Sequence, residues 1–168
     1  MLENWARLAE IVGAGGVIGS LIYVGFQIRK NTAAVRSAAA QAVHDNYSAW
    51  YSSMQSDPEL LSISINGMRD YSSLSEVQKA QFIAMFMSFS SYSQNAFYKW
   101  REGSLSPELW KGWEFVTMNF ISTRGGKEFW KERGYIFSED YRRHVETEIM
   151  PRKPHPGARP WGAFPIDD

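Results

Sequence analysis

The sequence predicts an all-α protein, in which one N-terminal transmembrane helix is continuous with a small helical bundle. Three observations predict this class. An uncharged run extends from Ile11 to Phe26. Later segments carry apolar side chains at three- and four-residue steps, the period of an amphipathic helix. No segment alternates apolar and polar residues between turn signals, as a half-buried strand does. The predicted domains are a membrane anchor over 1–30, a helical bundle over 31–150 and an extended Pro-rich tail over 151–168.

The predicted anchor has the length of one membrane crossing. Taken from Leu8 to Ile28, it extends roughly 30 Å as a helix, close to one hydrocarbon thickness. Trp5 and Tyr23 lie near its ends, where amphipathic rings favour the lipid headgroups. A buried helix of a soluble protein is the alternative. The glycines of the run weaken a helix in water but are tolerated in lipid, so they favour the anchor.

A cleavable secretory signal fits this segment less well, and charge predicts its orientation. The N-terminal flank contains Glu3 and Glu10 rather than a positive region, and no small-residue cleavage site follows. Arg7 is the only cation before the run, whereas three cations follow it, namely Arg29, Lys30 and Arg36. The positive-inside rule therefore predicts a single-pass protein with its N-terminus outside and its main domain in the cytoplasm. The absence of cysteine agrees with this location.

The glycines of the anchor predict a contact surface rather than a nucleotide site. Their spacing does not match the G-x-G-x-x-G fingerprint, and no strand precedes them. A small-xxx-small face instead permits close approach of a second helix within the membrane. The predicted helix–helix interface consists of Gly15, Gly16, Gly19 and Ser20.

Capping signals divide the remaining chain into helices. Neither glycine nor proline occurs between Gly25 and Pro58, so the anchor and the first bundle helix are predicted to be one rod. The segment Asp57-Pro58-Glu59 is typical of a helix start, and this short helix should end near Asn66-Gly67. A capping box from Ser73 to Glu76 should begin a long helix that ends at about Glu102.

Two further regions complete the predicted bundle. Ser106-Pro107-Glu108 should begin a helix that Gly125-Gly126 ends. Shorter pieces follow over 127–133 and 138–150, the second capped by Ser138. The long helix and its successor carry the expected core stripes, which are Phe82, Phe86, Phe89, Phe97 and Trp100 on the first and Leu109, Trp113, Val116 and Phe120 on the second.

Three short motifs carry a resemblance to a known group of proteins. The first is LIYV-x-x-QIR-x-NT-x-A-x-R, over residues 21–36. The second is G-x-L-x-x-E-x-W, over residues 103–110, and a looser third contains Trp130, Arg133 and Phe137. The chain resembles, over most of residues 5–150, a widespread group of uncharacterised bacterial proteins. The resemblance implies a bacterial membrane anchor with a helical cytoplasmic domain, and it implies no activity.

The sequence offers no recognisable catalytic or metal site. Cysteine is absent, and His44, His144 and His155 form none of the usual metal-binding spacings. No serine stands in a nucleophile elbow. Lys+Arg and Asp+Glu balance at 18 each, so no global field attracts nucleic acid. We therefore expect no catalytic residues, no metal, no cofactor and no nucleic-acid partner.

Two regions could bind a ligand or a partner. A pocket in the aromatic core would be lined by Phe86, Tyr92, Gln94, Asn95 and Trp113, with the two amides as its polar groups. Plain core packing is the alternative for these residues. In the tail, Trp161 and Phe164 could dock on the bundle or on a partner, and a disordered tail is the alternative.

The predicted function follows from location rather than chemistry. We expect a non-enzymatic accessory or scaffold protein of the bacterial inner membrane. It would bind partner proteins, or a second copy of itself, through the anchor and the cytoplasmic helices. A binder of lipid or of small apolar ligands, using the aromatic helical core, is the alternative.

Overall fold

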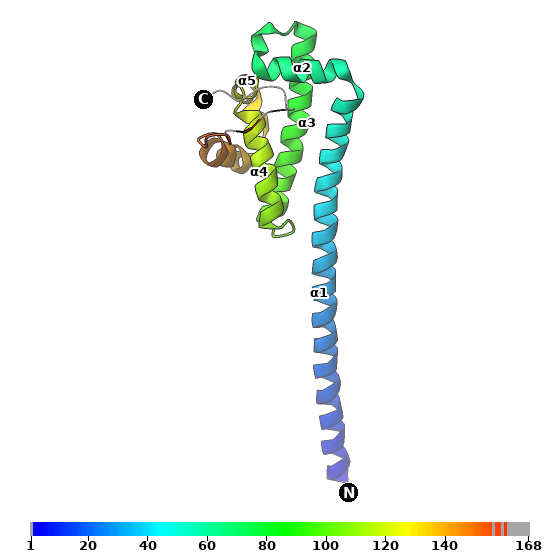
Figure 1. Ribbon diagram of the computed structural model, residues 1–168. Helices are drawn as coiled ribbons and strands as arrows, with labels where there is room; N and C mark the ends of the chain where they lie inside the picture. The colour runs from blue at the N-terminus through cyan, green and yellow to red at the C-terminus, as the bar shows by residue number, and fades with distance from the viewer. Residues whose placement is uncertain (1, 156, 159, 161–168) are drawn as a thin grey trace. The chain divides into compact units, whose positions relative to one another are not determined.

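The computed structural model describes the backbone of residues 2–155, 157–158 and 160, and side chains from residue 13 onward. Over those residues the chain is helical and contains no strand, which confirms the all-α class (Figure 1). The elements, in order, are α1 Leu2–Ser56, α2 Pro58–Arg69, the 3-10 turn η1 Tyr71–Ser73, α3 Glu76–Arg101, α4 Pro107–Ile121, α5 Arg124–Arg133, the 3-10 turn η2 Gly134–Ile136, α6 Glu139–His144 and the π-helical turn η3 Val145–Ile149.

The first helix continues without a break from Leu2 to Ser56, as the absence of glycine and proline after Gly25 predicts. The chain nevertheless divides into two compact units, residues 1–38 and residues 39–168. The first unit consists of the N-terminal part of α1. The second contains the rest of α1 and the bundle.

The helical form of the N-terminal segment is confirmed, but its transmembrane character is not shown. Among the described residues, no helix combines enough length with enough hydropathy to cross a bilayer. The apolar run of the sequence begins at Ile11, and side chains are described from Gly13.

Two of the predicted helix starts are confirmed, and one is displaced. The Asp57 carboxylate accepts hydrogen bonds from the backbone N–H groups of Glu59 and Leu60, both at 3.0 Å. Ser106 caps α4 in the same way. The capping box of α3, however, is formed by Ser75 and Gln78 instead of Ser73 and Glu76.

The glycine pair Gly125-Gly126 has a different role from the predicted one. α4 already ends at Ile121, and the two glycines form the first turn of α5, which Thr123 caps. A Cβ atom on Gly125 would collide with the carbonyl oxygen of Gly67 in α2. Glycine is therefore required at position 125, where α2 and α5 touch, because only glycine leaves room for the neighbouring backbone. A Cβ atom on Gly126 would instead collide with the Phe120 carbonyl oxygen at the end of α4.

α3 lies at the centre of the bundle, in contact with α2, α4 and α5. Its predicted stripe is buried at Phe82, Phe86, Phe89 and Phe97, whereas Trp100 is only half-buried. The rings pack against one another and against rings of other helices: the centroids of Phe82 and Phe86 are 4.4 Å apart, and those of Phe86 and Phe129 are 5.2 Å apart. Such contacts add to the energy gained from burying the rings.

Candidate functional site

The predicted small-residue face is open along α1. A Cβ atom added at Gly15, Gly16 or Gly19 would meet nothing within 4 Å. Ser20 is exposed, and its hydroxyl donates a hydrogen bond to the Val17 carbonyl of the same helix at 2.8 Å. The four residues are free to receive a second helix, and the interface itself stays a prediction.

Large apolar side chains surround the same part of α1. Eight of them are exposed, with fractions that run from 49% at Val24 to 65% at Leu21. They are Val17, Ile18, Leu21, Ile22, Tyr23, Val24, Phe26 and Ile28. At 100° per residue, positions 21 to 24 alone sample every side of a helix. A helix that is apolar all round is normally buried, either in a protein core or in a membrane.

The residues of the predicted core pocket make separate contacts in the bundle, and the pocket itself stays a prediction. Phe86 is buried among other rings, and Trp113 is half-buried, with its ring 6.1 Å from that of Phe89. Gln94 is half-buried, and its Oε1 accepts a hydrogen bond from the Ser138 N–H at 2.8 Å. Asn95 is exposed and Tyr92 is half-buried. Plain core packing and capping account for these contacts.

The long-range role of Gln94 replaces the cap predicted for Ser138. The Ser138 side chain makes no capping bond to α6 and accepts a hydrogen bond from the Tyr98 hydroxyl at 2.7 Å instead. Gln94 and Tyr98 both belong to α3, so side chains of α3 fix the start of α6. Sequence spacing gives no sign of a contact that joins positions so far apart in the chain.

A shallow groove lies on the bundle between α1, α2 and α3. It has a volume of about 260 Å³ and an uncharged lining, which consists of Trp50, Ser53, Met54, Leu60, Gln81, Ala84, Met85 and Ser88. Its floor is apolar, because Trp50, Met54 and Met85 are buried core residues. None of the residues predicted for the core pocket lines it.

A polar cluster in the bundle is centred on Glu114 of α4. Its carboxylate receives the Arg152 guanidinium at 2.7 Å and lies 3.1 Å from His144 Nε2. The side chains of Glu114 and His144 are 13% and 14% exposed. The cluster thus joins α4 to the end of α6 and to the residues that follow η3. Sequence reasoning missed it, because the three residues are widely separated in the chain.

Aromatic rings enclose the histidine of this cluster. The centroid of His144 lies 5.0 Å from that of Phe97 and 5.6 Å from that of Trp110. Trp110 in turn stacks on Trp100, with a centroid distance of 5.3 Å and an angle of 12° between the planes. His144 is thus paired with Glu114 and packed among these rings, and its contacts join α6 to α3 and α4.

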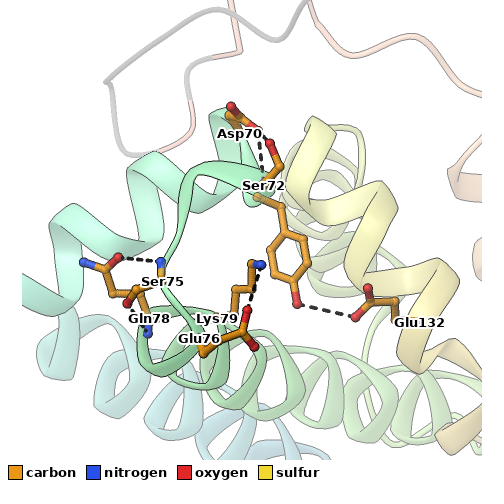
Figure 2. Close-up of polar contacts among 8 residues, drawn as sticks. Asp70, Ser72, Ser75, Glu76, Gln78, Lys79 and Glu132 are labelled. Atoms are coloured by element: carbon orange, nitrogen blue, oxygen red, sulfur yellow. Dashed lines mark hydrogen bonds and ion pairs between the residues drawn. The ribbon is translucent and has the colours of Figure 1, made fainter.

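A second polar cluster organises the connection from α2 to α3 (Figure 2). The Asp70 carboxylate accepts hydrogen bonds from the hydroxyl and the N–H of Ser72, at 2.6 and 3.0 Å. Those bonds lower the pKa of Asp70 from its ordinary value, the side-chain bond being the larger cause. The Tyr71 hydroxyl donates to Glu132 of α5 at 3.4 Å, and partial burial, followed by the Glu132 charge, raises the pKa of Tyr71. These contacts close a turn and hold α5 beside it.

Buried hydroxyl groups lie inside the bundle. Ser93 of α3 and Thr117 of α4 share a hydrogen bond of 2.7 Å. Tyr141 of α6 is fully buried, and its hydroxyl makes no hydrogen bond of good geometry. Burial raises the pKa of Tyr141, and the Ser93 side chain offsets part of that rise. The phenol therefore stays neutral and acts as a core residue.

The remaining features are the predicted docking residues of the tail and the residue types that bind metal ions. Trp161 and Phe164 lie outside the described residues. Within the part of the chain that is described, no three His, Cys, Asp or Glu side chains come close enough together to hold a metal ion.

Comparison with known proteins gives no relative. No family model, no curated protein and no solved structure matches this chain. The resemblance to the group of uncharacterised bacterial proteins therefore stays a prediction from the motifs alone.

Proposed function

We propose that this chain is a membrane-anchored accessory or scaffold protein without catalytic activity. Its N-terminal helix anchors it in a bacterial inner membrane as a single-pass protein, with the bundle in the cytoplasm. It binds partner proteins, or a second copy of itself, through the anchor and the helices of the bundle.

One observation carries the proposal: the exposed apolar surface of α1 between Val17 and Ile28. Leaving a large apolar side chain in water forgoes about 1.5–3 kcal/mol each, so a free helix of this kind would not persist in water. A lipid environment or partner helices satisfy such a surface on all sides, and the small-residue face allows one partner to approach closely.

The polar clusters of the bundle support a binding role rather than a catalytic one. Glu114 is already engaged by His144 and Arg152, and Asp70 is engaged by the turn that it closes. Glu114 thus joins α4 to α6, and Asp70 closes the connection between α2 and α3. A rigid bundle of this kind presents fixed surfaces to a partner.

Cross-linking tests the proposal. Membranes that contain the protein are washed with alkaline carbonate and then treated with an amine-reactive cross-linker. We expect the protein to stay in the membrane and to give cross-linked oligomers or partner adducts. Gly15→Leu combined with Gly19→Ile should keep the protein in the membrane and lower the cross-linked yield several-fold, because bulky residues block the backbone approach.

Gly25→Leu provides the matched control. Gly25 is equally open, and at 100° per residue it lies on a different side of α1 from Gly15 and Gly19. The cross-linked yield of this control should equal that of the unchanged chain. Release of the unchanged chain from the membrane by carbonate would overturn the proposed anchor. Equal yields from the double variant and the control would overturn the small-residue interface.

The groove between α1, α2 and α3 favours a second candidate, a binder of lipid or small apolar ligands. Methionines line it beside Trp50, and methionine side chains adapt readily to apolar ligands. Ala84 is exposed at the groove, so Ala84→Trp fills it without disturbing the core. Binding of a fluorescent fatty acid that Ala84→Trp abolishes would support this role. Binding that the substitution leaves unchanged would contradict it.

A further inference from the structure

The cations that follow the apolar run of α1 form an unneutralised basic segment. Arg29, Lys30 and Arg36 are all exposed. The sequence contains no acidic residue between Glu10 and Asp45. Among the described residues, no carboxylate lies within ion-pair distance of the three cations. Their charge is therefore available to an external anion.

The helix places these cations at the depth of lipid headgroups if the apolar run lies in the hydrocarbon. Arg29 and Lys30 lie only about 5 Å beyond Phe26 along the axis, at 1.5 Å per residue. Arg36 follows Arg29 by two turns, about 10 Å, on the same side of the helix. Helical side chains lean towards the N-terminus, so the long Arg36 side chain extends back towards the apolar run.

Two shallow hollows on this helix combine apolar and cationic groups. One, of about 180 Å³, is lined by Ile22, Gly25, Phe26 and Arg29. The other, of about 470 Å³, is lined by Gln27, Ile28, Lys30, Asn31 and Ala34. In each hollow a cation stands beside exposed apolar side chains. This pairing suits an amphiphile, whose phosphate and acyl chain are joined, better than a free phosphate ion.

We propose that Arg29, Lys30 and Arg36 bind the headgroup phosphates of anionic phospholipids. The inference rests on the proposed membrane anchor, and it adds the class of lipid that the anchor selects. Zwitterionic lipids carry an amine that offsets their phosphate, whereas anionic lipids leave a net charge for the three cations to meet. Each cation near an anionic surface favours association by about fivefold. Exposed ion pairs weaken with salt, so this preference should be salt-dependent.

Lipid retention tests the inference on the full chain. The protein is reconstituted in bilayers with equal amounts of phosphatidylglycerol and phosphatidylcholine, extracted in mild detergent, and the retained lipids are quantified by mass spectrometry. We expect phosphatidylglycerol to be enriched several-fold. The ratio of retained phosphatidylglycerol to retained phosphatidylcholine should fall to about one in the variant Arg29→Gln/Lys30→Gln/Arg36→Gln. It should also fall to about one for the unchanged chain at high salt.

A variant with the same change in net charge is the control. Lys111, Lys127 and Lys131 are exposed residues of the bundle, and their replacement by Gln should leave the enrichment unchanged. Equal enrichment in the unchanged chain and in the variant without the three α1 cations would overturn the inference. A parallel carbonate wash separates the two proposals: a protein that stays in the membrane without lipid preference refutes only the lipid inference, whereas a released protein refutes the anchor.

Discussion

At the residue scale, Tyr141 shows how a fully buried polar group can lower the stability of the fold instead of raising it. Its ring packs 5.6 Å from Phe97, but its hydroxyl lacks a well-formed hydrogen bond. An unsatisfied buried hydroxyl costs about 1–3 kcal/mol. Tyr141→Phe should therefore leave the free energy of unfolding unchanged or raise it by about 1 kcal/mol, as measured by denaturant unfolding in mild detergent.

Tyr98→Phe is the matched control for that substitution, because it removes a hydroxyl that does donate a hydrogen bond, to Ser138 at 2.7 Å. It should lower the free energy of unfolding by about 1 kcal/mol. A loss of the same size in Tyr141→Phe would show that its hydroxyl is satisfied, for example by an internal water molecule.

The Asp70 carboxylate makes the α2–α3 connection sensitive to acid. Hydrogen bonds from Ser72 hold the pKa of this carboxyl below its ordinary value of 3.8. A lowered pKa stabilises the fold above the unfolded-state pKa, and that stabilisation is lost as the pH falls through the lower folded-state pKa. We expect NMR titration to show Asp70 ionising below 3.8. Ser72→Ala should bring the pKa back towards 3.8, and an unchanged pKa in Ser72→Ala would disprove this origin.

At the scale of an element, the crossing of α2 and α5 depends on glycine. A Cβ atom at Gly125 would strike the Gly67 backbone, which cannot move aside as a flexible side chain can. Gly125→Ala should thus lower the free energy of unfolding by about 1–3 kcal/mol, the usual cost of overpacking.

Gly112 of α4 supplies the control for this crossing, because a Cβ atom there would meet nothing within 4 Å. Gly112→Ala should be neutral or stabilising by up to about 1 kcal/mol, since alanine favours a helix. Thermal and denaturant unfolding measure both variants. Equal stability of the two would mean that α2 and α5 do not touch through their backbones.

The sequence predicts the start of a helix well where a capping residue lies beside it. It fails where the contact that explains a residue comes from a distant part of the chain. The caps at Asp57 and Ser106 are local, and both are confirmed. Gly125-Gly126 resembles a helix stop, yet Gly125 is explained by the close approach of Gly67 in α2, and Gly126 by that of Phe120 at the end of α4. The same holds for Gln94, whose side chain accepts a hydrogen bond from the Ser138 N–H at the start of α6. Periodicity identifies the buried side of α3, but Leu109 of the predicted α4 stripe is 49% exposed. It also does not show which partner a polar side chain meets.

At the scale of the whole molecule, the sequence indicates the location more readily than any chemistry. The cluster of Glu114, His144 and Arg152 cannot be recognised in the sequence, because no spacing rule joins residues so far apart in the chain. The proposed anchor, by contrast, is a continuous apolar run in the sequence, and its large side chains from Val17 to Ile28 are exposed. Location is therefore the property to test first in the intact protein.

The orientation of the chain can be measured with single cysteines, because the natural sequence contains none. One variant carries Glu3→Cys, before the apolar run. The other carries Lys111→Cys, an exposed position in the bundle. The excess of Lys and Arg after the run predicts that the bundle stays in the cytoplasm. A membrane-impermeant maleimide, applied to intact spheroplasts, should label position 3 and leave position 111 unlabelled until the membrane is permeabilised.

Neutralising Arg29, Lys30 and Arg36 should weaken this asymmetry, since the rule counts Lys and Arg close to the span. A fraction of the chains should then expose position 111 to the reagent in intact spheroplasts. If position 111 alone is labelled when Arg29, Lys30 and Arg36 are all present, the orientation of the chain is the reverse of the predicted one. That orientation would also place the three cations on the outer surface, where the cytoplasmic excess of anionic lipid does not reach them. The predicted topology and the proposed lipid preference are thus linked, because both depend on which side of the membrane receives the same three charges.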